Sequence, residues 1–363
     1  MDPEQTTSLC NSCPKLCRFT CPVADVERDE STTPWGKMSA MKLADDGKIA
    51  WDARTASLAY KCLQCGASEG VCELHNPVPE TLLKYRIRAF QTGVAPAPLY
   101  PFVKEFQDHN NPCQIDLFER LKTEFPEEMK KPFARIAYFA GCTEIRYFPD
   151  TIGKTLRLLR EMKIAISLFQ EPILCCGYPL YAAGDLEGFK ELAEINVQSL
   201  KKYREVWSSC AECLYTMEVL YREMGFSFST RFFHVSEKIP PSSSPSLTKR
   251  GRGGDLKIAY HDPCSLGRYR KIYDAPRKII EQVTGQPPVE FHRNREGSYC
   301  CGAGGLVPVT SPKTADQITR NRLEEFRATG ATRLVTACPN CVRRFQEVDP
   351  KLDVVSLIDF LAV

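Results

Sequence analysis

The chain has 363 residues, enough for two or three domains with buried cores. Its 48 basic and 45 acidic residues leave a formal charge of only +3, which gives no reason to expect a nucleic-acid or membrane-surface partner. The N-terminus lacks the basic and apolar stretches of a signal peptide, and no uncharged apolar run approaches the roughly 20 residues that span a bilayer. We therefore expect a cytoplasmic protein without a transmembrane segment, associated with the inner face of the membrane only through a partner.

Cysteine is the abnormal component, with 18 residues in the chain. Disulfides are disfavoured in a reducing cytoplasm. Because the cysteines are grouped at regular spacings, the sequence predicts that they bind metal ions or clusters.

The N-terminal segment carries four cysteines in a compact run. Cys10, Cys13, Cys17 and Cys21 lie in "CNSCPKLCRFTCP", which resembles the bacterial ferredoxin run with one extra residue. In two-cluster ferredoxins the fourth cysteine of each run ligates the other cluster. The resemblance therefore implies a [4Fe-4S] cubane cluster on Cys10, Cys13, Cys17 and Cys72.

A second ferredoxin-like run follows, but it is degraded. "CLQCGASEGVCE" contains Cys62 and Cys65, with Ser68 where the pattern has its third cysteine. The resemblance implies a second cubane cluster on Cys62, Cys65 and Cys21. The fourth ligand of this cluster stays open between a Ser68 alkoxide and His75. A [3Fe-4S] cluster on three thiolates, or loss of this cluster, also fits the sequence.

A helix and a connecting segment follow the second run. Residues 80–92 predict an amphipathic helix that closes this domain, with Gly93 as its C-cap. Residues 94–134 are rich in proline and carry Cys113. Because no other cysteine lies at ligand spacing from it, we expect Cys113 to be structural.

The remaining ten cysteines form two sets of five with one layout. Each set consists of a single cysteine, then a Cys-Cys pair, then a Cys-x-x-Cys pair. The two intervening stretches are 32 and 33 residues long in the first set and 35 and 36 residues long in the second. The first set is Cys142, Cys175, Cys176, Cys210 and Cys213, and the second is Cys264, Cys300, Cys301, Cys338 and Cys341. Flanking sequence also repeats, since "RIAYFAGC" matches "KIAYHDPC", so the pattern indicates duplication. The Pro-, Ser- and Gly-rich residues 240–255 predict a linker between the copies.

Each copy has the pattern of alternating strands and helices. In the first copy residues 135–141, 164–169 and 205–209 predict strands, and Asp185 is expected to cap a long helix. The second copy repeats the order. Alternation predicts a parallel sheet with helices on both faces, and each set of cysteines then gathers near the carboxyl ends of the strands, where sites form.

Glycines follow both Cys-Cys pairs, at positions 177, 302, 304 and 305. We expect them to let the backbone approach a metal closely. A phosphate loop is the alternative, but the spacing of the known phosphate-binding motifs is absent.

The two sets resemble the CCG domain, named for the Cys-Cys-Gly at 175–177 and 300–302, over residues 135–363. That family includes the catalytic subunit of heterodisulfide reductases and the iron–sulfur subunits of glycolate oxidase, lactate-utilisation and anaerobic glycerol-3-phosphate dehydrogenase complexes. The resemblance implies that each set holds a non-cubane [4Fe-4S] cluster, that up to two such clusters face a disulfide, and that all ten cysteines are catalytic. A structural zinc is the alternative, but a thiolate-bound tetrahedral zinc leaves the fifth cysteine unexplained.

Two functions share this architecture. In the first, electrons pass from the N-terminal clusters to the CCG clusters, which reduce a small-molecule disulfide. His261 and Asp262 lie beside Cys264 and are candidates to supply protons. His261 also fits an ordinary histidine at the end of a strand. In the second, the chain relays electrons from a flavoprotein dehydrogenase for a 2-hydroxy acid or glycerol-3-phosphate to quinone. Because no flavin or nicotinamide motif is present, both require a redox partner protein, either a flavoprotein or a membrane quinone or cytochrome subunit.

The sequence thus predicts an α/β protein. Residues 1–93 are expected to form a mainly helical ferredoxin-like iron–sulfur domain, and 94–134 connect it to the first CCG domain at 135–239. The linker at 240–255 leads to the second CCG domain at 256–363, and the two tandem domains are expected to be pseudo-symmetric.

Overall fold

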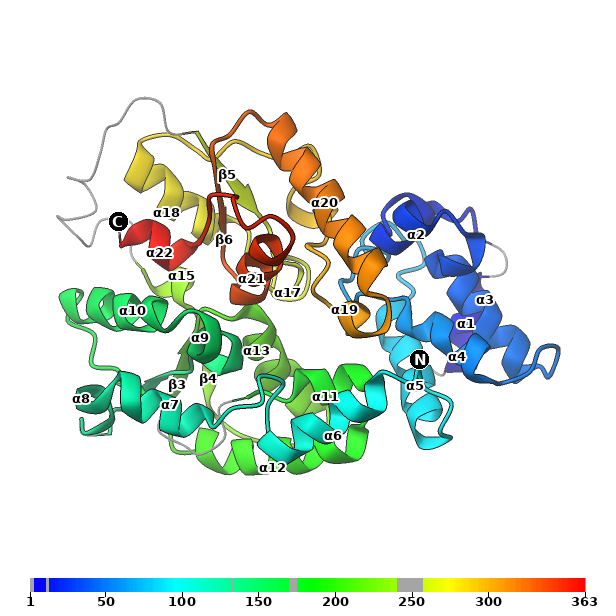
Figure 1. Ribbon diagram of the computed structural model, residues 1–363, viewed down its shortest axis with the longest axis horizontal. Coiled ribbons are helices and arrows are strands. Elements are labelled where there is room, and N and C mark those ends of the chain that lie inside the picture. Colours follow the sequence, from blue (N-terminus) through cyan, green and yellow to red (C-terminus); the bar gives the residue numbers. More distant parts are fainter. Residues whose placement is uncertain (1–2, 11–12, 132, 170–174, 240–256, 363) are drawn as a thin grey trace.

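The computed structural model describes residues 3–10, 13–131, 133–169, 175–239 and 257–362. The linker predicted at 240–255 lies outside these residues. Figure 1 shows a helical N-terminal lobe beside two lobes that each contain a sheet and helices. Among the described residues, no helix has the length and apolar character needed to cross a membrane.

Short helices make up the N-terminal lobe. Proline lies in the first helical turn of four of them, α1, α2, α3 and α5, where its missing N–H costs no hydrogen bond. The helices are α1 (Pro3–Leu9), α2 (Pro22–Glu27), α3 (Pro34–Asp45), α4 (Ala53–Tyr60) and α5 (Val78–Gln91), with 3₁₀ turns η2 (Leu16–Phe19) and η3 (Glu30–Thr32). Helix α5 confirms the helix predicted for 80–92, and Gly93 follows it with φ of 72°.

The connecting segment is helical and packs on the first sheet-containing lobe. Its helices are α6 (Leu99–His109), α7 (Leu117–Glu124) and α8 (Pro126–Met129). Helix α6 contacts α11 and helix α7 contacts α9.

The first α/β lobe has a four-stranded parallel sheet in the order β2-β1-β3-β4. Ala137 of the central strand β1 pairs with Ser167 and Val206 on either side. The strands are β1 (Ile136–Tyr138), β2 (Ser167–Leu168), β3 (Glu205–Ser208) and β4 (Arg231–His234). The helices are α9 (Gly141–Tyr147), α10 (Pro149–Glu161), α11 (Tyr178–Ala183), α12 (Leu186–Leu200), α13 (Ala211–Tyr215), the π-helical turn η4 (Thr216–Leu220), α14 (Tyr221–Glu223) and α15 (Val235–Lys238). As predicted, Asp185 caps α12 by accepting a hydrogen bond from Gly188 N at 3.1 Å.

The second α/β lobe has a three-stranded parallel sheet in the order β5-β6-β7. Its strands are β5 (Ile258–His261), β6 (Arg333–Thr336) and β7 (Val354–Ser356). Its helices are α17 (Cys264–Gly267), α18 (Asp274–Thr284), α19 (Val307–Thr310), α20 (Pro312–Ala328), α21 (Pro339–Val348) and α22 (Leu357–Leu361), with the 3₁₀ turn η5 (Arg295–Gly297). These elements confirm the predicted α/β class.

The second copy departs from the expected order at its middle strand. Only an isolated bridge between Ala259 and Val289 stands there. Pro287 and Pro288 precede Val289, and proline has no N–H to donate to a strand ladder. The repeat therefore keeps its topology with one strand reduced to a single pair.

The N-terminal lobe packs closely on the second copy, where α20 reaches α2 (Figure 1). A Cβ placed on Gly304 would lie 2.3 Å from the Leu63 carbonyl oxygen, and one on Gly305 would lie 2.2 Å from that of Cys62. These two glycines therefore allow close contact between lobes. Their expected role in close approach of the backbone to a metal stays a prediction.

Candidate metal centres

The first set of five cysteines comes together at the carboxyl ends of strands of the first sheet. Cys142 lies in the first turn of α9, after β1, and Cys210 precedes α13, after β3. The Sγ atoms of Cys175 and Cys142 are 3.8 Å apart. The Cys176 thiol contacts those of Cys175 and Cys213, and Cys213 also contacts Cys210. The five buried thiols thus form one continuous group, as the parallel topology predicts.

A cavity of about 230 Å³ lies between this set and the second α/β lobe. All five cysteines of the first set line it, and the facing wall comes from residues 303–309 and 339–347. Asn340 joins the walls, because its Nδ2 donates to Glu212 at 2.9 Å and its Oδ1 accepts from Thr143 at 2.7 Å. Burial and the neighbouring thiols raise the pKa of the Glu212 carboxyl well above its usual value.

The second set gathers in the same way behind β5 and β6. The Cys300 thiol contacts Cys264 and Cys301, and Cys341 contacts Cys301 and Cys338. None of these five is among the residues that line the 230 Å³ cavity. The two sets therefore share a layout but have different surroundings.

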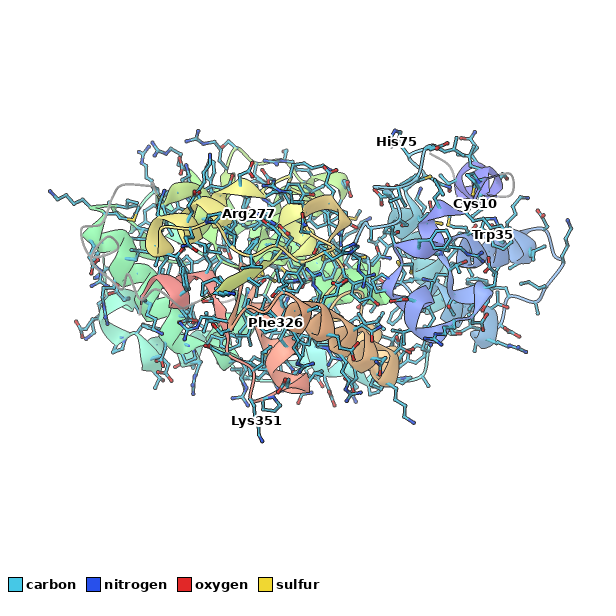
Figure 2. The ribbon with its side chains drawn as sticks, turned by 90° about the horizontal axis from the view of Figure 1, so that it is seen from above. Cys10, Trp35, His75, Arg277, Phe326 and Lys351 are labelled. Carbon is cyan, nitrogen blue, oxygen red and sulfur yellow. The ribbon has the colours of Figure 1, made fainter. Side chains whose placement is uncertain are left out.

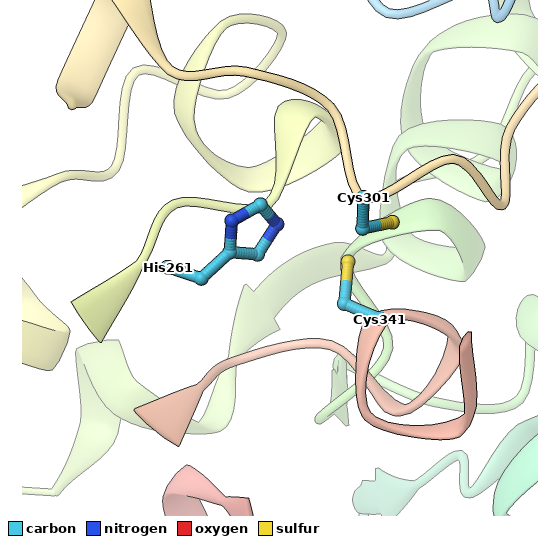
Figure 3. A group of neighbouring side chains, drawn as sticks. All are labelled: His261, Cys301 and Cys341. Atoms are coloured by element: carbon cyan, nitrogen blue, oxygen red, sulfur yellow. The ribbon is translucent and has the colours of Figure 1, made fainter. Parts of the chain in front are cut away.

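His261 faces the second set from the end of β5 (Figure 3). Its ring lies near Cys301 and Cys341, with the candidate ligand atoms of the three residues within 4.8 Å of one another. His261 Nδ1 accepts a hydrogen bond from Arg322 Nε at 3.1 Å, which leaves Nε2 to carry the ring proton. Burial lowers the pKa of His261, so the neutral ring is favoured.

Asp262 binds an arginine side chain and a backbone N–H rather than cysteine thiols. Its two carboxylate oxygens accept from Arg277 at 2.7 and 2.8 Å, and Arg295 N adds a third bond at 2.8 Å. Its carboxylate is thus committed to a buried ion pair. Neither Asp262 nor His261 lines the cavity.

The first N-terminal group comprises the four cysteines that the ferredoxin resemblance brings together. Cys10 lies close to Cys13, Cys17 and Cys72, and burial together with the charges of these neighbours raises its pKa to about 12. Buried Asn76 donates from Nδ2 to Cys10 Sγ at 3.2 Å and from its backbone N to Cys72 Sγ at 3.4 Å. Figure 2 shows Cys10 in the N-terminal lobe, apart from the two larger lobes.

The second N-terminal group surrounds a small cavity of about 20 Å³. Cys21, Cys62, Cys65 and Ser68 all line it. His75 instead lies exposed, at the edge of the lobe in Figure 2. Of the two open candidates for the fourth ligand, the geometry therefore favours Ser68.

Three buried cations border this second group and its neighbours. Lys37 Nζ lies 3.8 Å from Cys21 Sγ, Arg86 Nη2 donates to the Cys62 carbonyl at 2.5 Å, and Arg268 Nε donates to the Cys65 carbonyl at 2.5 Å. Within the described part of the chain, no carboxylate forms an ion pair with any of the three cations.

An unpaired buried cation is costly unless an opposite charge is near. A thiolate-ligated iron–sulfur cluster is negatively charged and would offset this cost. The donor set and the buried charges therefore fit such a group.

Comparison with known proteins identifies the family. Residues 136–218 and 258–346 match the model of the cysteine-rich CCG domain. A subunit of the dihydromethanophenazine:CoB–CoM heterodisulfide reductase of Methanosarcina mazei is 30% identical over 83% of this chain and 75% of its own length. The subunit of the same name from Methanosarcina acetivorans is 29% identical over 79% and 72%. The chain belongs to the CCG-domain iron–sulfur oxidoreductase family.

A third relative of this CCG-domain protein is named for a different activity. A subunit of the fumarate reductase (CoM/CoB) of Methanothermobacter marburgensis is 26% identical over 90% of this chain and 65% of its own length. These relatives are all named as reductase subunits, and this chain has an iron–sulfur redox role.

The CCG-domain resemblance gave no sign of a sixth cysteine at the first set. Cys113 does not stand apart as expected, because its thiol contacts that of Cys142 and also lies 3.7 Å from the Cys142 carbonyl oxygen. Asn111 holds this loop, donating to the His109 and Ile115 carbonyls at 2.7 and 2.8 Å and accepting from Cys113 N at 2.9 Å. Sequence spacing could not reveal this contact, because the fold of the connecting segment creates it.

His234 is a further residue that sequence reasoning missed. Its Nε2 lies 3.2 Å from both the Ser209 and the Ala337 carbonyl oxygens, which directly precede Cys210 and Cys338. One buried imidazole thus ties together the equivalent loops of the two CCG repeats. No sequence signal beyond its place at the end of a strand distinguishes it.

Proposed function

We propose that this chain is an iron–sulfur oxidoreductase subunit that reduces a disulfide in the cavity between its two CCG repeats. The observation that carries the proposal is that all five cysteines of the first set line this cavity, while the second repeat supplies the opposite wall. Such a cavity suits a small molecule that must reach the sulfur-rich wall.

We assign the cysteines to four sites. Clusters bound there would supply one-electron transfer. The proposed ligands are Cys10, Cys13, Cys17 and Cys72; Cys21, Cys62, Cys65 and Ser68; Cys142, Cys175, Cys176, Cys210 and Cys213; and Cys264, Cys300, Cys301, Cys338 and Cys341. We propose cubane clusters for the two N-terminal sites and non-cubane clusters for the two sets of five.

The cavity offers polar groups as well as thiols. Arg343 lies at its wall, stacks on Tyr147 at 4.1 Å and forms an ion pair with Glu347 at 2.6 Å. Leu306 and Val309 add apolar surface. This lining suits a disulfide with an apolar body and an anionic end.

A redox partner protein would meet the first N-terminal site. Large apolar side chains are exposed beside its cysteines, namely Leu9 (37%), Leu16 (43%), Phe19 (76%) and Leu74 (49%). Exposed apolar groups around a redox site support docking of a partner there. We propose that this partner is a flavoprotein or a membrane cytochrome subunit.

Anaerobic turnover tests the proposal, with a reduced viologen as donor and small disulfides as substrates. Val309→Trp would narrow the cavity and is expected to lower kcat/KM for the disulfide about tenfold or more, at unchanged iron and sulfide content. Val219→Trp is the matched control, because Val219 is also half-buried but does not line the cavity.

Two outcomes contradict the proposal in different ways. Zinc without inorganic sulfide would exclude both redox functions. Clusters that ignore every disulfide, yet are reduced by a flavoprotein and its 2-hydroxy acid, would instead support the relay function.

A further inference from the structure

Arg268 holds together the segments that carry two of the proposed sites. It follows the short helix α17, which begins at Cys264, and is buried with 8% exposure. Its Nε donates to the Cys65 carbonyl at 2.5 Å. Its Nη1 donates to the carbonyls of Ser298 at 2.7 Å and Glu296 at 3.1 Å, in the loop that leads to Cys300.

The remaining nitrogen of this guanidinium has no protein partner. Arg268 Nη2 is buried, and the described residues offer it no hydrogen-bond acceptor. The groups that can carry opposite charge around the cation include the thiols of Cys65, Cys264 and Cys300, together with the Tyr269 hydroxyl and the Glu69 carboxyl. A buried N–H without a partner is rare and indicates a missing acceptor. Here the acceptor would be a sulfur atom of the bound group.

The two sites are also in direct contact at this point. The thiol of Cys65, from the second N-terminal group, contacts that of Cys300 in the second CCG set. Arg268 is therefore placed where one positive charge acts on both sites.

We propose that Arg268 is a positioning residue shared by the second N-terminal cluster and the second CCG cluster, with Nη2 donating a hydrogen bond to a sulfur of the CCG cluster. This inference rests on the cluster assignment above. Hydrogen bonds to sulfur and nearby positive charge both stabilise the reduced, more negative state of a cluster. Arg268 thus raises the reduction potentials of the two clusters.

The first repeat provides an internal control. Arg146 stands four residues after Cys142, as Arg268 stands four residues after Cys264. Arg146 is exposed and lies over the Tyr147 ring at 5.8 Å, so it has none of the buried bonds of Arg268. The same motif position therefore has this role only in the second repeat, where the N-terminal lobe contacts it through the Cys65 carbonyl.

Redox titration followed by EPR tests the proposal on the full, anaerobically prepared protein. Arg268→Gln is expected to shift the midpoint potentials of both clusters to more negative values, and Arg268→Lys is expected to restore most of the shift. Arg146→Gln should leave both potentials unchanged. Arg277→Gln controls for the loss of a buried arginine. Arg277 binds the carboxylates of Asp262 and Glu290, so its loss should leave both midpoint potentials unchanged.

A second measurement covers the case in which Arg268→Gln fails to load clusters. In wild-type protein labelled with ¹⁵N-arginine, hyperfine spectroscopy of the second CCG cluster should show a guanidinium nitrogen coupling that Arg268→Lys removes. Loaded clusters without this coupling, or with potentials that Arg268→Gln does not change, overturn the inference alone. Absence of iron and sulfide from the wild-type protein would instead overturn the cluster assignment.

Discussion

The thiol of Cys210 contacts that of Cys338, so equivalent cysteines of the two repeats meet at the interface between them. On its far side the second set touches the N-terminal lobe, where Cys300 contacts Cys65. The cavity lies on the side of the first set. The second set is therefore placed between the N-terminal sites and the set that lines the cavity.

This order predicts unequal effects for equivalent substitutions. Cys301→Ala removes a ligand of the second set. Electrons that enter at the N-terminal sites should then no longer reach the first-set cluster, because the second set lies between them. Cys176→Ala should abolish the response to disulfide yet leave the second-set cluster reducible. Freeze-quench EPR after mixing with reductant measures both, and the N-terminal spectra should persist in each variant. Equal loss of reduction in the two variants would contradict the order.

Ser68 predicts a change in the stability of the second N-terminal cluster. It lines the same small cavity as Cys21, Cys62 and Cys65, and its oxygen is a harder, less acidic ligand than a thiolate. Ser68→Cys should therefore increase iron retained per chain under mild chelation, and Ser68→Ala should decrease it. Iron and sulfide analysis with EPR checks this, and His75→Ala should have no effect. If His75→Ala loses iron and Ser68→Ala does not, the assigned fourth ligand is wrong.

The cysteine spacing predicted which residues share a set, because parallel strands carry their carboxyl ends to one edge of a sheet. It did not predict what surrounds each set. Arg146 and Arg268 occupy the same motif position, yet only Arg268 is buried, since the N-terminal lobe meets the second repeat at this position but packs on the first repeat elsewhere, at α11. Contacts between distant lobes leave no periodic signal in a single sequence.

The glycines show the same limit. Gly304 and Gly305 follow a Cys-Cys pair, a position that indicates a role at the metal. The structure explains them by the carbonyls of Cys62 and Leu63, which a side chain would meet. A glycine can be recognised as necessary from sequence, but its neighbour is known only after the lobes are placed.

Cys113 predicts a shift in the potential of the first-set cluster. Its contact with Cys142 holds the pKa of the Cys142 thiol well below the usual value, as expected when a neighbouring S–H donates to a thiolate. Cys113→Ala removes this donor and should make the midpoint potential more negative. Cys113→Ser keeps an O–H donor and should lie nearer the wild type. Redox titration with EPR measures the shift, and loss of iron in Cys113→Ser would show that Cys113 is a ligand instead.

His234 predicts that acid weakens the fold within a defined pH window. Burial lowers its pKa to about 4, from the 6.5 of an ordinary histidine. Between these values the unfolded chain binds a proton that the folded chain does not. The free energy of unfolding should therefore fall as the pH decreases from 6.5 towards 4, by at most about 1.4 kcal/mol per pH unit from this residue. Above pH 6.5 the contribution is constant.

Chemical denaturation across this window, under anaerobic conditions, compares wild type with His234→Gln. The variant should be less stable at pH 7.5, because the imidazole that joins the Ser209 and Ala337 carbonyls is gone. Its stability should also depend less steeply on pH, with His261 retaining part of the slope because burial lowers its pKa too. His109→Gln, at an exposed histidine, is the control. An unchanged dependence of unfolding free energy on pH in His234→Gln would show that His234 is already protonated in the folded protein at pH 5. A charged ring, rather than a neutral one, would then join the two repeats.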